Sequence, residues 1–170
     1  MDAVPATFAA GCYWGTERHF VKQFKDGLIT HSVGFMGGST ATKPTYKSVC
    51  SGTTGHAEVL HLTYDPGKVA YKDLVLYFFR MHNPNRHVAK SQYRSAIFYH
   101  SEEQRKDAEA IIRMLNEGAT EPSKLMKEAF GNDSIQTTLE PAAQFFDAHT
   151  EHQNYHEKNP KAQCSHRVCW

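Results

Sequence analysis

The stretch VPATFAAGCYWGTERHFVKQF, residues 4–24, contains the pattern on which the expected fold rests. Its first part, Val4 to Ala10, is short and mostly apolar, as expected of a buried strand. Gly11-Cys12-Tyr13-Trp14-Gly15 follows at once, and from Thr16 the apolar residues Phe20, Val21 and Phe24 fall on one helical face. We therefore predict a strand and a helix joined at a glycine-flanked junction that carries Cys12.

The same periodicities predict the remaining elements. Strands are expected over Leu28 to Phe35, Glu58 to Tyr64, Ala96 to Tyr99 and Ser134 to Leu139, and helices over Tyr71 to Met81, from Ser101 to Gly118 and over Ala142 to about His152. The segment Lys43 to Glu58 is expected to be a loop that enters a strand, and the tail from Asn159 onward to be coil. Few short strands alternating with helices favour an α/β (α+β) fold, a two-layer sandwich in which helices cover one face of a mixed sheet as in a ferredoxin-like plait.

Composition limits the class of protein. The chain of 170 residues has 40% apolar residues, 22% charged residues and a net charge of +1, so it predicts a single globular domain, 1–170, with no general attraction to nucleic acid or to membranes. The N-terminus has an acid where a signal peptide has basic residues, and no apolar run is long enough to span a bilayer. We expect a cytoplasmic monomer. In the cytoplasm thiols stay reduced, and cysteines are more often catalytic, redox-active or metal-binding than structural.

Cys12 gives the strongest chemical signal. A thiol in the first turn of a helix is close to unpaired backbone N–H groups, and this position predicts a pKa below the usual value of about 8.5. Tyr13 and Trp14 beside it could form the walls of an apolar pocket. A buried structural cysteine among core aromatic residues is an equally good interpretation of the residues alone.

Two further positions could take part in chemistry. Glu58 stands at the start of an apolar strand, where a carboxyl group tends to keep its proton and could act as a general acid, although a surface glutamate is the simpler interpretation. Tyr93, in Gln92-Tyr93-Arg94-Ser95, could donate a hydrogen bond to a substrate oxygen or could only pack. Cys50 is expected to be a small buried residue rather than a second nucleophile.

The tail 158–170 contains Cys164 and Cys169, with His149, His152 and His156 shortly before it. Two cysteines in a mobile tail suit thiols that move to meet a sulfenic acid. Inert tail cysteines rank second. A zinc site ranks third, because the spacing is wide for paired ligands and no second pair exists.

Four blocks of sequence together resemble the peptide methionine sulfoxide reductase A family. They are Gly11 to Gly15, Tyr46 through Glu58, Gln92 to Phe98, and His152-Gln153-Asn154-Tyr155 with Lys158-Asn159-Pro160. They occur in the family's order and extend over nearly the whole chain. The resemblance implies reduction of the S epimer of methionine sulfoxide, free or in proteins, with thioredoxin as reductant and without a metal or other cofactor.

The resemblance also implies roles for individual residues. Cys12 would attack the sulfoxide sulfur, and Tyr13 and Trp14 would hold the substrate's methyl group. Glu58 would protonate the sulfoxide oxygen, with Tyr46 and Tyr93 as its hydrogen-bonding partners. Attack would leave a sulfenic acid on Cys12, Cys164 would resolve it as a disulfide, and Cys169 would be a second resolving thiol.

Three departures from the family pattern qualify these roles. Tyr13 stands where the family usually has phenylalanine, so a hydroxyl enters an apolar pocket and needs a partner. The family's His-Asp-Pro is His82-Asn83-Pro84 here. The loop 85–91 is shorter than usual and lacks the aspartate that lines the family's site, which predicts weaker orientation of the substrate.

Two rival functions use the same residues differently. A cysteine hydrolase would pair Cys12 with a histidine base such as His56 and would need no resolving tail. A zinc-bound interaction module would use Cys164, Cys169 and nearby histidines. Burst release of an amine or alcohol would indicate the first, and metal analysis would test the second.

Overall fold

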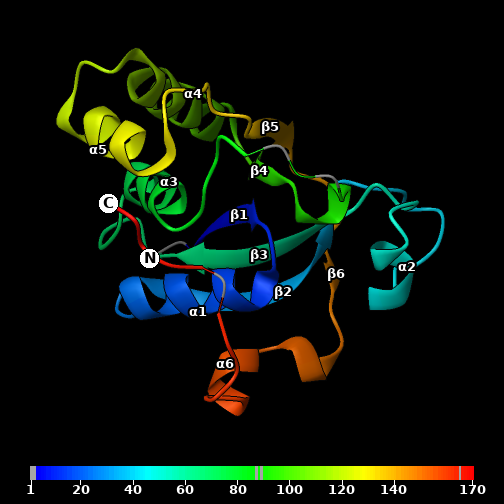
Figure 1. The fold of residues 1–170 in the computed structure, drawn as a ribbon. Coiled ribbons are helices and arrows are strands. Elements are labelled where there is room, and N and C mark those ends of the chain that lie inside the picture. Colours follow the sequence, from blue (N-terminus) through cyan, green and yellow to red (C-terminus); the bar gives the residue numbers. More distant parts are fainter. Residues whose placement is uncertain (1–2, 87, 89, 165) are drawn as a thin grey trace.

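The computed structural model describes residues 3–86, 88, 90–164 and 166–170, and Figure 1 shows its ribbon. Within this part of the chain the strands are β1 (Val4–Ala10), β2 (Leu28–Met36), β3 (Ala57–Tyr64), β4 (Ser95–Tyr99), β5 (Thr138–Pro141) and β6 (Phe146–Asp147). The α-helices are α1 (Tyr13–Gln23), α2 (Tyr46–Cys50), α3 (Tyr71–Arg80), α4 (Glu102–Glu117), α5 (Glu121–Phe130) and α6 (Tyr155–Lys158). Short 3-10 turns lie at Ser91–Tyr93 and Thr150–His152.

The strands form one mixed sheet in the order β5-β4-β1-β3-β2-β6. Its four central strands run antiparallel in the order β4-β1-β3-β2, and β5 joins β4 in parallel. With α1 between β1 and β2 and α3 between β3 and β4, this is the arrangement of a ferredoxin-like plait. The expected fold class is confirmed.

The main core lies between one face of the sheet and the helices. Phe8 of β1 is fully buried, and its ring centroid lies 5.1 Å from that of Phe20 in α1 and 5.5 Å from that of Phe78 in α3. The opposite face carries the smaller cluster of Ala9, Met36, Val59 and Phe98, which is covered by Ala142 and Phe145 rather than by a helix. Helices therefore cover one face of the sheet, as the sequence predicts.

Several expected elements differ from the structure. The helix predicted over Ala142 to His152 is wrong, because Phe146 pairs with Phe35 in β6 and the 3-10 turn begins only at Thr150. The predicted loop before Glu58 contains α2, and the predicted strand over Ser134 to Leu139 lies at Thr138–Pro141. In contrast, β1 has the predicted ends, and α4 begins after its N-cap Ser101 and ends at Gly118.

Helix α1 lies beneath the C-terminal tail, which runs across it from α6 toward the end of α3 (Figure 1). The tail ends against that helix: Cys169 N–H donates to the carbonyl oxygen of Arg80 at 2.9 Å, and the Arg80 guanidinium lies 5.9 Å from the centre of the Trp170 ring. In the described part of the chain, no helix has the length and apolar character needed to cross a bilayer.

Candidate active site

Cys12 is the N-cap residue of α1, between the end of β1 and the first turn of the helix. Gly11 before it has a φ of +85°, a conformation that residues with a side chain rarely adopt, and this allows the sharp turn. The Cys12 side chain is partly buried, and the thiol is free. The junction predicted from the sequence is therefore present, and it presents the sulfur at the helix N-terminus.

The expectation that the pKa of Cys12 is lowered is wrong for this structure. Burial raises the pKa of Cys12 to about 11, and the negative charge of Glu58 adds to the effect. The backbone N–H groups of Trp14 and Gly15 act in the opposite direction, as expected at a helix N-terminus, but they do not outweigh burial. The resting thiol is therefore protonated at neutral pH.

Glu58 is the buried acid of the site. It lies at the second position of β3 with only 1% of its surface exposed, so the simpler interpretation as a surface glutamate is wrong. Its Oε1 accepts a hydrogen bond of 3.2 Å from Tyr13 N–H, and its Oε2 has no partner in the described part of the chain. Burial raises the pKa of Glu58 to about 7, so a large fraction of this carboxyl group holds its proton at neutral pH.

Tyr46 and Tyr93 meet at the edge of the same site. Tyr46 begins α2 and Tyr93 ends the 3-10 turn before β4, and a hydrogen bond between their side chains lowers the pKa of Tyr93. Burial, together with the charge of Glu58, nevertheless raises the pKa of both tyrosines, so both keep their hydroxyl protons. The side chain of Cys50 also hydrogen-bonds to Tyr46, and it is only partly buried, whereas the sequence analysis expected a buried residue.

Aromatic rings form the walls of the site. The Tyr13 ring is fully buried, with its centroid 6.5 Å from that of Tyr46. Its hydroxyl has no partner among the described residues, so the partner that the sequence analysis required is not supplied. Trp14 stacks on Tyr155 with ring centroids 3.8 Å apart and an interplanar angle of 9°, and its Nε1–H donates to His152 Nδ1 at 3.0 Å.

His152 and Tyr155 were assigned no role in the site by the sequence analysis. His152 also stacks on Tyr46 with centroids 4.6 Å apart, so it joins two walls of the site. Between them, Gln153 is held by the backbone of β2, because Val33 N–H donates to Gln153 Oε1 and Gln153 Nε2 donates to the Val33 carbonyl. The His152-Gln153-Asn154-Tyr155 block was the only sequence signal for these residues. The contacts of this block could not be predicted from it, because Trp14, Val33 and Tyr46 lie more than 100 residues away in the sequence.

The tail places Cys164 beside the first turns of α1. A Cβ atom on Gly15 would lie 2.9 Å from Cys164 Sγ and 2.1 Å from His166 Nδ1, so the tail packs here only because residue 15 is glycine. His166 Nε2–H donates to the Ala10 carbonyl, and His19 Nε2–H donates to the His166 carbonyl at 2.9 Å. Cys164 Sγ lies 3.8 Å from His19 Nε2.

Cys169 lies farther along the tail, where its thiol faces the Arg167 carbonyl at 3.4 Å. The resemblance implies a chemical role for six residues, and the structure brings four of them together: Cys12, Glu58, Tyr46 and Tyr93. These four lie close enough that the charge of one raises the pKa of another. A negative charge on Cys164 also raises the pKa of Cys12, whereas Cys169 has no such effect on it.

The rival functions find little support in the geometry. His56, the candidate base of a hydrolase, is buried with both ring nitrogens occupied: Nδ1 accepts from Gly38 N–H and Nε2 donates to the Ser39 carbonyl. In the residues that the structure describes, no three His, Cys, Asp or Glu side chains converge as metal ligands would.

Comparison with known proteins decides the family. The family model described as Peptide methionine sulfoxide reductase matches residues 4–169. The chain belongs to the peptide methionine sulfoxide reductase family. This reductase is 45% identical over 164 residues to the Peptide methionine sulfoxide reductase MsrA of Methanothermobacter thermautotrophicus, covering 94% of this chain and 89% of that protein. It is 41% identical to the MsrA of Deinococcus radiodurans, over 91% of this chain and 71% of that protein.

Solved structures agree with this assignment. The reduced form of Mxr1 from Saccharomyces cerevisiae matches the reductase with a TM-score of 0.86 and 32% identity, covering 99% of this chain and 93% of that chain. Methionine sulfoxide reductase A of Corynebacterium diphtheriae matches with a TM-score of 0.73 and 31% identity, over 96% of this chain and 78% of that chain. The reductase is therefore an oxidoreductase that acts on methionine sulfoxide.

Proposed function

We propose that this enzyme reduces the S epimer of methionine sulfoxide, free or within proteins, with Cys12 as nucleophile and Glu58 as acid. The observation that carries the proposal is the buried carboxyl group of Glu58, whose pKa is raised to about 7 and whose Oε2 has no partner among the described residues. A protonated carboxyl group with a free oxygen suits a sulfoxide oxygen, because protonating that oxygen makes the sulfur electrophilic.

The first step needs a thiolate and a proton donor at the same time. Because the charge of Glu58 raises the pKa of Cys12, a protonated Glu58 favours ionisation of the thiol. The thiolate attacks the sulfoxide sulfur while Glu58, with Tyr46 and Tyr93, gives up or shares a proton with the oxygen. Oxygen transfer then leaves methionine and a sulfenic acid on Cys12, so that one thiol and one sulfoxide become one sulfenic acid and one thioether.

The second step uses the tail. The Cys164 thiol condenses with the sulfenic acid, which releases water and forms a disulfide between Cys164 and Cys12. Packing of the tail against Gly15 supports this role for Cys164. Cys169, on the far side of His166, would act as a second resolving thiol that takes the disulfide over by exchange.

Thioredoxin would complete the cycle by exchanging its dithiol for the disulfide. Support comes from a relative, since Mxr1 from Saccharomyces cerevisiae has been solved in complex with Trx2, and that structure matches this chain with a TM-score of 0.65 and 26% identity over 99% of this chain and 91% of that chain. We place this repair of oxidised proteins in the cytoplasm and assign it to a monomer of one domain, where a thioredoxin system keeps the four free cysteines reduced.

The test follows NADPH consumption through thioredoxin and thioredoxin reductase, with each sulfoxide epimer supplied separately. We expect turnover of the S epimer alone. Cys12→Ser is expected to abolish it, whereas Cys164→Ser is expected to release one methionine per enzyme and then stop. Equal turnover of both epimers, or full turnover by the Cys12 variant, would refute the proposal.

A further inference from the structure

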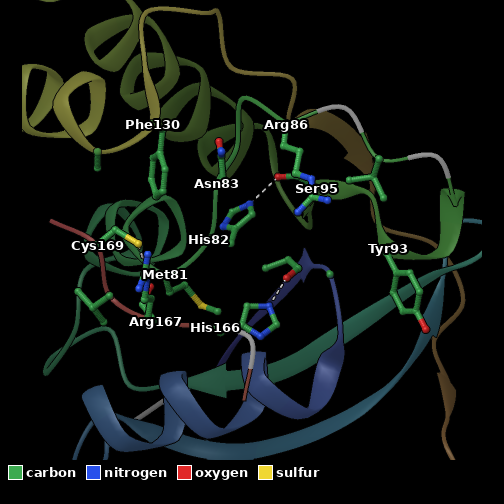
Figure 2. A pocket seen from close by; sticks show the side chains of 15 residues that line it. Met81, His82, Asn83, Arg86, Tyr93, Ser95, Phe130, His166, Arg167 and Cys169 are labelled. Atoms are coloured by element: carbon green, nitrogen blue, oxygen red, sulfur yellow. Dashed lines mark hydrogen bonds between the residues drawn. The ribbon is translucent and has the colours of Figure 1, made fainter. Parts of the chain in front are cut away.

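A cavity of about 810 Å³ lies beside the candidate active site. The ends of α3 and α5, the segment after α3 and the tail surround it, as Figure 2 shows through Met81, Asn83, Phe130 and Arg167. We call it the tail cavity. Its volume is in the range of pockets that hold ligands of several hundred daltons, and it exceeds what the side chain of one methionine sulfoxide needs.

The charged groups of the tail cavity are all cationic. Arg86 and Arg167 are exposed residues that line it from different segments, and no aspartate or glutamate is among its lining residues. Neither arginine forms an ion pair within the part of the chain that the structure describes. Figure 2 shows them on opposite sides of the cavity. The cavity therefore offers two free guanidinium groups to a ligand.

The remaining walls add little charge. Burial lowers the pKa of His82 and of His166, so both imidazoles are neutral at pH 7. Phe130 and Val168 contribute apolar surface. A ligand that fits should therefore carry a carboxylate for the arginines and apolar or backbone surface for the walls, since arginine binds carboxylates well.

The tail cavity adjoins the reacting groups. Gly11, which directly precedes Cys12, lines it, and so does Tyr93. The Tyr93 side chain extends away from the middle of the cavity in Figure 2, and its hydrogen bond to Tyr46 belongs to the candidate active site. A chain that placed an oxidised methionine at Cys12 would therefore reach the cavity with residues next to it.

From this geometry we infer that the tail cavity is a subsite for an acidic side chain that flanks the oxidised methionine in a polypeptide substrate. The inference rests on the proposed function, because it takes Cys12 as the reacting group. One of the two guanidinium groups, of Arg86 or of Arg167, binds the carboxylate of the flanking residue, and the other adds to the positive potential of the cavity. The enzyme therefore prefers oxidised methionines with aspartate or glutamate nearby over those next to lysine or arginine.

The first test compares three short peptides of equal length, in which oxidised methionine is flanked by aspartate, serine or lysine. At low salt we expect kcat/KM for the aspartate peptide to exceed that for the lysine peptide about five- to tenfold, the size expected when a partly solvated attraction to aspartate is compared with a repulsion of lysine, and salt to reduce the difference. The double variant Arg86→Gln with Arg167→Gln should bring the ratio close to one. Arg113→Gln, an exposed arginine on α4 away from the cavity, should retain it.

The second test measures binding without chemistry. Fluorescently labelled peptides of the same sequences, with norleucine in place of oxidised methionine, are titrated with the reduced protein and followed by anisotropy. The aspartate peptide should bind more tightly than the lysine peptide to the unmodified protein, and equally tightly to the double variant. This result supports the subsite even if no sulfoxide peptide is reduced, an outcome that would refute the proposed function alone.

Three outcomes would overturn the inference. The first is equal binding and equal kcat/KM for all three peptides. The second is an aspartate preference that survives in the double variant, which would place the recognition elsewhere. The third is a loss of kcat/KM by the double variant for free methionine sulfoxide but not for the aspartate peptide, which would mean that the arginines bind the amino acid's own carboxylate.

Discussion

Glu58 and Cys12 titrate as a pair, because burial raises the pKa of each group and the charge of Glu58 raises that of Cys12 further. Their pKa values of about 7 and about 11 are in the reverse order from the one that the proposed reaction requires, which is a protonated Glu58 with a thiolate on Cys12. Only a small fraction of the enzyme is in the reactive state, and between these two pH values that fraction is constant.

This pairing predicts the pH profile of sulfoxide reduction in a single turnover. Below pH 7 the rate should fall about tenfold per pH unit, since both groups are then protonated, and between pH 7 and pH 11 it should be level. In Glu58→Gln the rate at pH 7 should be about 10- to 100-fold lower and should rise steadily with pH, because only the thiol titrates. The measurement is rapid-quench methionine release across pH, and a level profile in the variant would contradict the pairing.

The buried hydroxyl of Tyr13 gives a second prediction at this scale. It has no partner among the described residues, and an unpaired buried polar group costs about 1–3 kcal/mol. Tyr13→Phe should therefore raise the free energy of unfolding by about 1 kcal/mol, as measured by urea denaturation. Tyr71→Phe, which removes another unpaired buried hydroxyl away from the site, is the matched control and should do the same. A loss of stability in the Tyr13 variant alone would show that its hydroxyl has a partner.

At the level of the element, the contact between the tail and α1 depends on the absence of a side chain at position 15. A methyl group there would overlap both His166 and Cys164. The helix itself would tolerate the change, because alanine favours helices more than glycine by about 1 kcal/mol. The substitution would therefore displace the tail rather than destabilise the helix.

Gly15→Ala is accordingly predicted to slow recycling more than the first turnover. Recycling by thioredoxin should fall about 10- to 100-fold, since Cys164 would be displaced from its position by an ångström or more. The check compares the methionine released in a single turnover with steady-state NADPH consumption. Adding His166→Ala removes the closer of the two overlaps and should restore part of the recycling rate; equal slowing of both steps would disagree with this explanation.

A comparison of predicted and observed helices and strands shows which of them the sequence alone could predict. Strand β1 and helix α4 were predicted with their ends, because each has local signals: a short apolar run, and an N-cap with a closing glycine. Helix α5 was not anticipated, although Thr120 and Gly131 mark its ends. The helix predicted over Ala142 to His152 is absent because Phe146 pairs with Phe35 as part of β6 and the Phe145 ring stacks on His61, and both partners lie far away in the sequence.

In the candidate site, too, residues in local motifs were predicted and long-range contacts were not. The resemblance to the family pointed to Cys12, Glu58 and the two tyrosines, because those residues lie in the matching blocks, whereas the local patterns alone left their roles open. They did not give the direction of the Cys12 pKa shift, because burial by distant segments outweighs the helix N-terminus. His152 is another long-range case, since its ring meets Trp14 and Tyr46 only after the chain has folded.

At the scale of the whole molecule, several histidines are packed in neutral form. Burial lowers the pKa of His82 to about 3, and its imidazole is held by Nδ1–H donating to the Phe78 carbonyl and by Nε2 bonded to Ser95 Oγ at 2.7 Å. The pKa is also lowered in His19, His61, His100, His152, His156 and His166, whereas that of His31 beside Glu17 is raised.

These shifts predict loss of stability in mild acid. An unfolded histidine takes up a proton near pH 6.5, whereas folded His82 stays neutral down to about pH 3, so its contribution is complete above pH 6.5 and is lost as the pH falls toward 3. For His82 alone the loss between pH 7.5 and pH 5 is about 2 kcal/mol, since the folded form takes up almost no proton over that range. Urea unfolding at pH 7.5 and pH 5 should show it, and His82→Gln should be less sensitive to pH than His149→Gln at an exposed position. Identical pH dependence in the two variants would contradict the assignment.

The chain has two tryptophans, and they lie in different parts of the structure. Trp14 is stacked on Tyr155 at the wall of the site, while Trp170 lies beneath the guanidinium of Arg80 at the end of the tail. Intrinsic fluorescence should therefore separate two events within one catalytic cycle. With Trp170→Phe the emission would report filling of the methyl pocket, and with Trp14→Phe it would report departure of the tail, each in real time and without an added dye.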